Sequence, residues 1–302
     1  MKKIFSYLLE YISWVDKRIL SLAIMFTAFA IFINYYCGLN DQIENLFFLK
    51  EFLSWYLIFF LAFTFGYALT KFLTHINPFT KVRFLFLLLI APAIFAWKMA
   101  ANIHFHFSTD IDLNAYWNAV IYWPFKLAVV SFLIFVMWIL VDKKEPFYAQ
   151  KIKGTNFKPY LLMLLIMVPL IAAASTQPDF LAMYPKMKSI HFLSGGNDRS
   201  FYKFLYELSY GSDFIGIELF FRGFLILAFI KYAGKHAILP MAMFYCTIHF
   251  GKPLAECISS FFGGIILGVV TYHTRTIWGG LIVHLGIAWL MELGGYLGNL
   301  YK

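Results

Sequence analysis

The sequence has few charged side chains for its length. Only 14% of the 302 residues are Asp, Glu, Lys or Arg, whereas soluble domains contain roughly 25%. Hydrophobic residue types make up 61% of the chain, and the mean hydropathy is +0.71. This composition excludes an ordinary soluble domain, and it predicts an integral membrane protein with the lipid bilayer as its first partner.

Cysteine is scarce as well. The three cysteines, Cys37, Cys246 and Cys257, lie in or beside apolar runs and show no CxxC spacing. An odd and small number of cysteines without regular spacing excludes a disulfide-rich scaffold. The HExxH motif, which places two zinc-binding histidines on one helical face, is also absent.

Acidic residues are outnumbered by basic ones, 16 to 25, and the formal net charge is +9. A basic chain can bind nucleic acid, but here Lys and Arg form short clusters between apolar runs, as in loops at a membrane surface. This placement excludes nucleic acid as a partner. Basic loops around residues 71–83 and 143–158 alternate with an acidic loop around 41–51, which predicts a cytoplasmic N-terminus.

Long apolar runs make up most of the chain. A helix needs about 20 mostly apolar residues to cross a hydrocarbon core of about 30 Å, and about nine runs come near this length. We therefore predict an all-α, polytopic transmembrane helical bundle. The expected spans are 18–37, 52–70, 84–100, 125–141, 160–175, 213–232, 237–250, 254–273 and 277–297.

One polar segment interrupts this series of apolar runs. Residues 176–212 contain Pro178, Pro185 and the pair Gly195-Gly196, which are turn and loop signals. We predict an N-terminal membrane region of about five helices at 1–175, a polar connecting loop at 176–212, and a helical core at 213–302 that holds the last four spans.

The ionisable residues of most interest inside the expected last four spans are Glu218, Arg222, His249 and His284, whereas Glu256 and Glu292 lie nearer the span ends. Such residues are costly in lipid and point to function by default. Glu218 and Arg222 are separated by four positions and share one face of an α-helix, so they can pair. A structural ion pair is the alternative interpretation of these two residues.

One carboxylate and two imidazoles on three helices can carry out chemistry together. Glu218, His249 and His284 can activate a water molecule as general bases, or they can bind a divalent metal such as zinc that does so. The metal alternative is not implied by the spacing, because the ligands would have to assemble from separate spans.

The last four spans resemble the CPBP intramembrane metalloproteases, which include the CAAX prenyl proteases and the bacteriocin-processing or Abi proteins. The first family motif is EExxxR followed by Gly, the second is FxxxH and the third is HxxxN. The matching residues are Ile217, Glu218, Arg222 and Gly223, then Tyr245 to His249, then His284 to Ala288, with the turn Thr274 to Trp278 also similar. The similarity extends over about residues 213–297.

The resemblance implies an intramembrane endopeptidase that cleaves a membrane-associated protein or peptide with activated water. We expect Glu218 and His249 to activate the water, His284 to stabilise the oxyanion or bind a metal, and Arg222 to hold Glu218. It also implies the cytoplasmic membrane of a bacterium.

Two motif positions depart from the family pattern. Ile217 replaces the first Glu, which has the general-base role in the family, and Ala288 replaces the Asn that helps to hold the oxyanion. The alternative is therefore a catalytically impaired member that acts as a membrane peptide-binding, immunity or regulatory protein. A third hypothesis, from the buried Glu-Arg pair, is a small ion-coupled transporter.

Overall fold

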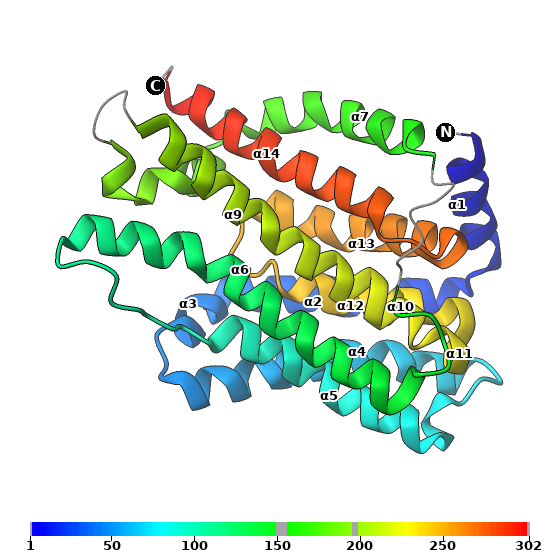
Figure 1. Cartoon of the computed structure of the whole chain (residues 1–302). Helices are drawn as coiled ribbons and strands as arrows, with labels where there is room; N and C mark the ends of the chain where they lie inside the picture. Colours follow the sequence, from blue (N-terminus) through cyan, green and yellow to red (C-terminus); the bar gives the residue numbers. More distant parts are fainter. Residues whose placement is uncertain (1, 149–155, 195–198, 301–302) are drawn as a thin grey trace. The chain divides into compact units, whose positions relative to one another are not determined.

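The computed structural model describes residues 2–148, 156–194 and 199–300, and its regular structure is helical. The polytopic all-α bundle predicted from the sequence is confirmed. The α-helices are α1 Lys2–Trp14, α2 Lys17–Cys37, α3 Leu39–Glu44, α4 Phe48–Leu73, α5 Val82–Ala100, α6 Ile111–Met137, α7 Lys158–Ala174, α8 Pro178–Met183, α9 Ser200–Glu218, α10 Leu225–Leu227, α11 Ile230–Ala233, α12 Ile238–Thr247, α13 Leu254–Thr274 and α14 Trp278–Leu300 (Figure 1). The π-helices η2 Trp138–Asp142 and η6 Leu219–Phe224 and the short 3-10 helices η1 Pro78–Thr80, η3 Lys186–Ser189, η4 His191–Ser194 and η7 Gly234–Ala237 complete the described elements.

Six helices in the described part of the chain are long and apolar enough to cross a membrane. They are α2, α4, α5, α6 with its η2 extension, α13 and α14. Three of the nine expected spans are shorter or broken. Helix α7 has 17 residues and α12 has 10, which at 1.5 Å per residue give lengths of about 25 and 15 Å.

The third of these, the expected span at residues 213–232, is divided into several short elements. It contains the end of α9, the π-helix η6, α10 and α11. Gly234 then ends α11 with φ 56° and ψ −135°. Only glycine adopts this backbone conformation readily, because it has no Cβ. The apolar run therefore predicts burial correctly but not a continuous helix.

The described helices form two compact units. Unit 1 consists of Met1–Ala101, Leu133–Gly154 and Leu219–Ile277, and unit 2 consists of Asn102–Phe132, Thr155–Glu218 and Trp278–Lys302. Each unit combines early and late segments of the chain. The division into regions 1–175, 176–212 and 213–302 stays a prediction.

In unit 1, helix α12 packs against α4 and α13. Its Phe244 ring lies 4.8 Å from Phe59 and 5.3 Å from Phe221, measured between ring centroids. Phe220 and Phe95 also contact it, at 5.8 and 6.1 Å. These rings are fully buried or nearly so, and such aromatic pairs stabilise a core beyond their area of burial. The cluster holds η6 against α12.

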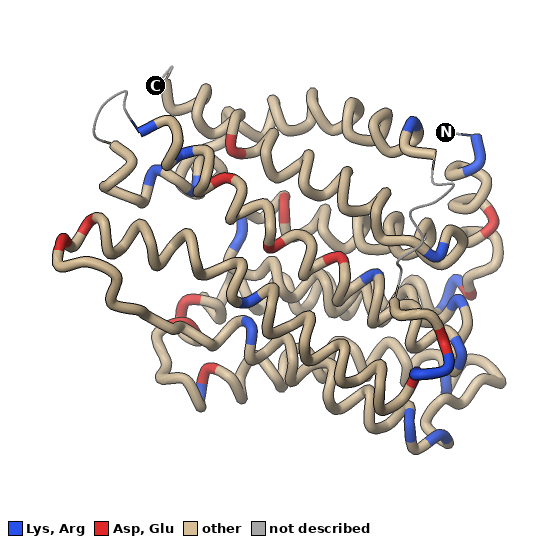
Figure 2. Tube along the Cα trace, viewed as in Figure 1, with Lys and Arg blue, Asp and Glu red and all other residues tan. Residues whose placement is uncertain are grey.

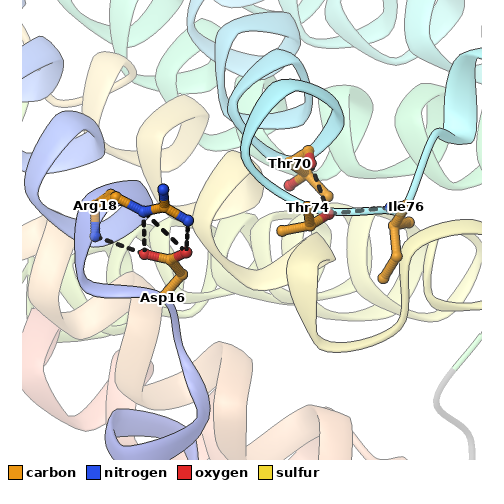
Figure 3. A network of polar contacts seen from close by, with 5 residues as sticks. All are labelled: Asp16, Arg18, Thr70, Thr74 and Ile76. Carbon is orange, nitrogen blue, oxygen red and sulfur yellow. Dashed lines mark hydrogen bonds and ion pairs between the residues drawn. The ribbon is translucent and has the colours of Figure 1, made fainter.

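Polar groups cap the helix ends of unit 1. Asp16 accepts a hydrogen bond of 2.8 Å from the Arg18 amide at the start of α2, and the Arg18 guanidinium also donates to it (Figure 3). This side-chain hydrogen bond lowers the pKa of Asp16 to about 2. At the end of α4, Thr74 donates to the Thr70 carbonyl and accepts from the Ile76 amide. These contacts satisfy backbone groups that a helix end leaves open.

In unit 2, helix α14 packs along α7 and along α9 (Figure 1). Small residues allow the close approach. A Cβ atom on Gly279 would lie 2.0 Å from the Tyr160 ring of α7, and one on Gly211 would lie 3.2 Å from the Trp289 ring of α14. Charged residues gather mainly at helix ends and in connecting segments, whereas α9 carries acidic residues along its length (Figure 2).

Candidate functional site

Glu218 and His284 form a hydrogen-bonded pair within unit 2. Glu218 is the last residue of α9, and His284 lies in the second turn of α14. The distance between His284 Nδ1 and Glu218 Oε1 is 3.0 Å across a sequence separation of 66 residues. The Glu218 side chain is fully buried, and 13% of the His284 side chain is exposed. The structure thus brings together two of the residues predicted from the sequence.

The surroundings of the pair fix the orientation of both side chains. The Phe214 ring, one turn before Glu218 on α9, contacts the His284 ring edge to face at 4.7 Å. Gly280 lies one turn before His284 on α14, and a Cβ atom there would be 2.6 Å from Glu218 Oε2. The absence of a side chain at position 280 therefore gives the carboxylate its place against the α14 backbone.

The chemistry of the pair follows from its hydrogen bond. A carboxylate oxygen only accepts, so Nδ1 of a neutral His284 carries the proton and donates it to Glu218. In this tautomer Nε2 carries the ring lone pair and can accept a proton. The carboxylate also stabilises the imidazolium that then forms. The pair can act as an oriented general base.

The two positions that depart from the family pattern lie in one apolar cluster beside this pair. Its buried members are Tyr210, Phe214, Leu281 and Ala288, and Ile217 packs against them. Phe214 belongs both to this cluster and to the contact with His284. The two apolar replacements, Ile217 and Ala288, thus belong to the same apolar cluster.

Arg222 and His249 lie in unit 1, and both contact the ring of Tyr245. The Arg222 guanidinium carbon is 4.1 Å from the centroid of the Tyr245 ring, and the His249 ring is 4.7 Å from the same centroid. His249 Nδ1 is 2.9 Å from the Tyr245 carbonyl oxygen, to which it donates in its neutral form. Arg222 is fully buried, where a cation–π contact contributes about 2 kcal/mol.

The segment between Glu218 and Arg222 is not an α-helix. Residues Leu219–Phe224 form a π-helix with hydrogen bonds from i to i+5. We expected positions 218 and 222 to share one helix face because an α-helix has 3.6 residues per turn. That expectation does not apply to a π-helix, which has more residues per turn. Such π-helical turns occur frequently at functional sites. No sequence pattern indicated this π-helix. Its residues Phe220 and Phe221 pack on Phe244.

Zinc binding is the alternative role predicted for Glu218, His249 and His284. Among residues 2–148, 156–194 and 199–300, no group of three or more His, Cys, Asp and Glu side chains is placed to hold a metal ion. Glu218 and His284 supply two donors that hydrogen bond to each other, whereas zinc sites use three or four protein ligands. Glu218 and His284 alone therefore do not make up a zinc site, and zinc binding by Glu218, His249 and His284 stays a prediction.

Comparison with known proteins identifies the segment that carries these residues. Residues 211–290 match the family described as type II CAAX prenyl endopeptidase Rce1-like. The matched segment contains Glu218, Arg222, His249, His284 and Ala288. The resemblance predicted from the motifs is therefore confirmed over this part of the chain. No curated protein and no solved structure matches the chain.

Proposed function

We propose that this integral membrane protein is an intramembrane endopeptidase, and that Glu218 and His284 are the pair that activates water. The observation that carries the proposal is their buried 3.0 Å hydrogen bond inside the Rce1-like segment. The substrate would be a membrane-associated protein or peptide with a prenyl-type anchor, in keeping with the description of the family.

The reaction begins with a water molecule hydrogen bonded to Nε2 of His284. Glu218 holds the ring through Nδ1, so Nε2 faces the water as a base. As the water oxygen attacks the scissile carbonyl, Nε2 takes one proton, and the C=O electrons move to oxygen to give a tetrahedral oxyanion. The carboxylate of Glu218 stabilises the imidazolium during this step without taking the proton.

The second step breaks the C–N bond. His284 returns its proton to the leaving nitrogen as a general acid, so the tetrahedral species collapses to a carboxylic acid and a free amine. His249 and Arg222, which also match family motif positions, remain proposed site residues. The role that suits a buried guanidinium and an imidazole is to stabilise negative charge in the transition state.

The test is cleavage of a fluorogenic prenylated peptide by the purified full-length protein in liposomes. We expect His284→Gln to lower the rate by about 10²- to 10⁴-fold, the usual contribution of a general base, because the amide can still donate to Glu218 but cannot accept a proton. His75→Gln, at an exposed histidine of unit 1, is the matched control and should cleave at the parent rate. Equal rates for His284→Gln and the parent would refute the assignment.

The glycine opposite Glu218 gives a second prediction for the same assay. In Gly280→Ala the new Cβ would lie 2.6 Å from Glu218 Oε2, and the flexible carboxylate, not the helix, would move. We expect about a 10²-fold loss of rate, as for other small misplacements of catalytic groups, with the thermal midpoint little changed. Gly263→Ala on α13 is the control, because a Cβ there meets no atom within 4 Å. A full rate in Gly280→Ala would contradict the close-packed arrangement.

The apolar cluster at Ile217 and Ala288 favours a second candidate function. A catalytically impaired member would bind the same membrane peptide without turnover, as an immunity or regulatory protein. In that case a photoreactive substrate peptide should crosslink to the parent protein without being cleaved. The double variant Ile217→Glu with Ala288→Asn should then create cleavage activity, which the parent lacks.

The orientation in the membrane belongs to the proposal as well. Lys235 pairs with Glu10 of α1, and Lys231 pairs with Asp142 of η2. Basic residues from the first turn of α5 (Arg83) and from the segment around α11 (Lys231 and Lys235) thus occur in one unit. This grouping supports a cytoplasmic N-terminus by the positive-inside rule, in the cytoplasmic membrane of a bacterium.

A further inference from the structure

Two of the three cysteines meet in unit 1. Cys246 lies near the end of α12, and Cys257 lies in the first turn of α13. Cys246 Sγ is 3.4 Å from the Cys257 carbonyl oxygen, and Cys257 Sγ is 3.8 Å from the Cys246 carbonyl oxygen. The two thiols also lie within hydrogen-bond reach of each other. These reciprocal contacts place both sulfur atoms between the same two helix backbones.

The helices that carry the two cysteines are packed closely. A Cβ atom on Gly264 of α13 would lie 3.2 Å from the Cα atom of Ala242 on α12. Both cysteines are 0% exposed, and the structure holds both as thiols. A disulfide requires two closely spaced backbones with side chains directed toward each other, and α12 and α13 provide this arrangement at positions 246 and 257.

The two cysteines lie at the ends of the turn that contains His249. The backbone amide of His249 donates to the Cys246 carbonyl oxygen at 3.0 Å, and the amide of Cys257 donates to the Pro253 carbonyl oxygen at 3.0 Å. A bond between the two sulfur atoms would therefore join the two ends of this turn. His249 is one of the proposed site residues, so the cysteine pair is next to the proposed site but does not belong to it.

Helix α2 fixes this turn at one end of unit 1. The side-chain amide of Asn34 donates to the Phe250 carbonyl oxygen at 2.9 Å, and the Tyr35 hydroxyl donates to the Lys252 carbonyl oxygen at 2.6 Å. Both donors lie in the last turn of α2, which is long and apolar enough to cross the membrane. With the N-terminus cytoplasmic, as proposed above, the turn faces the extracytoplasmic side, where disulfides form and persist.

We propose that Cys246 and Cys257 are a modification site, at which a disulfide oxidant converts the two thiols to a disulfide between α12 and α13. One thiolate of the pair attacks a sulfur of the oxidant, forms a mixed disulfide and releases one thiol. The second thiolate then attacks the cysteine sulfur of the mixed disulfide and releases the other thiol. Two electrons pass to the oxidant, and the two cysteine protons end on the two released thiols.

The disulfide would restrain the turn at residues 247–256. A cross-link removes open conformations from the segment between its ends. The contacts of Asn34 and Tyr35 hold the middle of this turn from one side, and the disulfide would hold its two ends. The oxidised protein thus keeps His249 at a fixed place relative to α12 and α13.

Mass spectrometry of the full-length protein tests the proposal. The protein in membranes is incubated with oxidised glutathione, denatured, alkylated with N-ethylmaleimide and digested. We expect a peptide pair linked through Cys246 and Cys257 in most molecules, with Cys37, an exposed thiol, alkylated. Alkylation of both Cys246 and Cys257 in most molecules overturns the proposal, as does a linkage of either one to Cys37.

Two single variants assign the linkage to this pair. Cys37→Ser is the matched control, because it removes an exposed thiol of the same unit, and the linked peptide pair should form as in the parent. In Cys246→Ser the pair should be absent and Cys257 should be alkylated. A Cys37→Ser protein that forms no linkage between Cys246 and Cys257 contradicts the proposal without any need for the buried variant to fold.

Hydrogen exchange measures the effect on the turn. The amides of His249, Phe250 and Lys252 donate to carbonyl oxygens within the segment, so their exchange reports its opening. We expect these amides to exchange about tenfold more slowly in the oxidised parent than in the same protein after reduction with dithiothreitol. Equal exchange in the two forms would show that the disulfide does not restrain the turn. None of these readouts depends on peptidase activity.

Discussion

Glu218→Gln is expected to lower peptide cleavage by about 10³- to 10⁴-fold while the protein stays folded. Glutamine has nearly the same shape, but its amide no longer enforces the tautomer in which His284 Nε2 is the base. Loss of an orienting carboxylate costs about 10⁴ in rate in other hydrolases that use a histidine base. Because Glu218 is fully buried, removing its charge also removes a desolvation cost, so the thermal midpoint should not fall steeply.

The double variant Glu218→Gln with His284→Gln shows whether the two residues act as one unit or independently. If the two side chains act as one unit, the double variant should be no slower than either single variant by more than a few fold. Independent roles would instead multiply the two losses. A Glu218→Gln protein that cleaves at more than about a tenth of the parent rate would show that the 3.0 Å hydrogen bond to His284 serves packing only.

Ala288→Asn is expected to raise the cleavage rate by about 10²- to 10³-fold, the value of one oxyanion donor. Position 288 lies one helical turn after His284 on the same face of α14, so in the proposed reaction a side-chain amide there is the expected oxyanion donor. The substitution introduces a polar group into the cluster of Tyr210, Phe214 and Leu281. It should therefore reduce the free energy of unfolding by about 1–3 kcal/mol.

Ala288→Leu is the matched control for this prediction. Leucine is similar in size to asparagine but has no hydrogen-bond donor, so it should fill the same space without increasing the rate. Single-turnover measurements on both variants, beside the parent, distinguish faster chemistry from faster product release. If the two variants cleave equally fast, position 288 has no part in holding the oxyanion.

The sequence predicted the membrane environment and the residues of interest from local information. Apolar runs bounded by charge indicated the bundle, and the costly positions Glu218 and His284 stood out because few ionisable residues occur inside such runs. The same pattern predicted one continuous helix at 213–232, but this segment contains a π-helix, and Gly234 ends the last short helix. Hydropathy reports burial of side chains, not the hydrogen-bonding pattern of the backbone.

The polar composition of residues 176–212 predicted a loop, but this segment also contains α8 and part of α9. Glu207 lay in that expected loop and carried no motif, yet it is on helix α9 and lies close enough to Glu292 of α14 for the two carboxyl groups to interact. An acidic residue in a polar stretch is ordinary in sequence terms. Its significance comes from the helix that approaches it, which no local pattern specifies.

By itself, the sequence determined an all-α membrane protein, the motif residues and the two apolar departures at Ile217 and Ala288. Only the tertiary structure decided that Glu218 meets His284 through Nδ1 and that Ile217 and Ala288 lie in one apolar cluster. The physical reason is the range of the interactions involved. Composition and helical periodicity act over a few residues, whereas a hydrogen bond between residues 66 apart depends on how α9 and α14 pack.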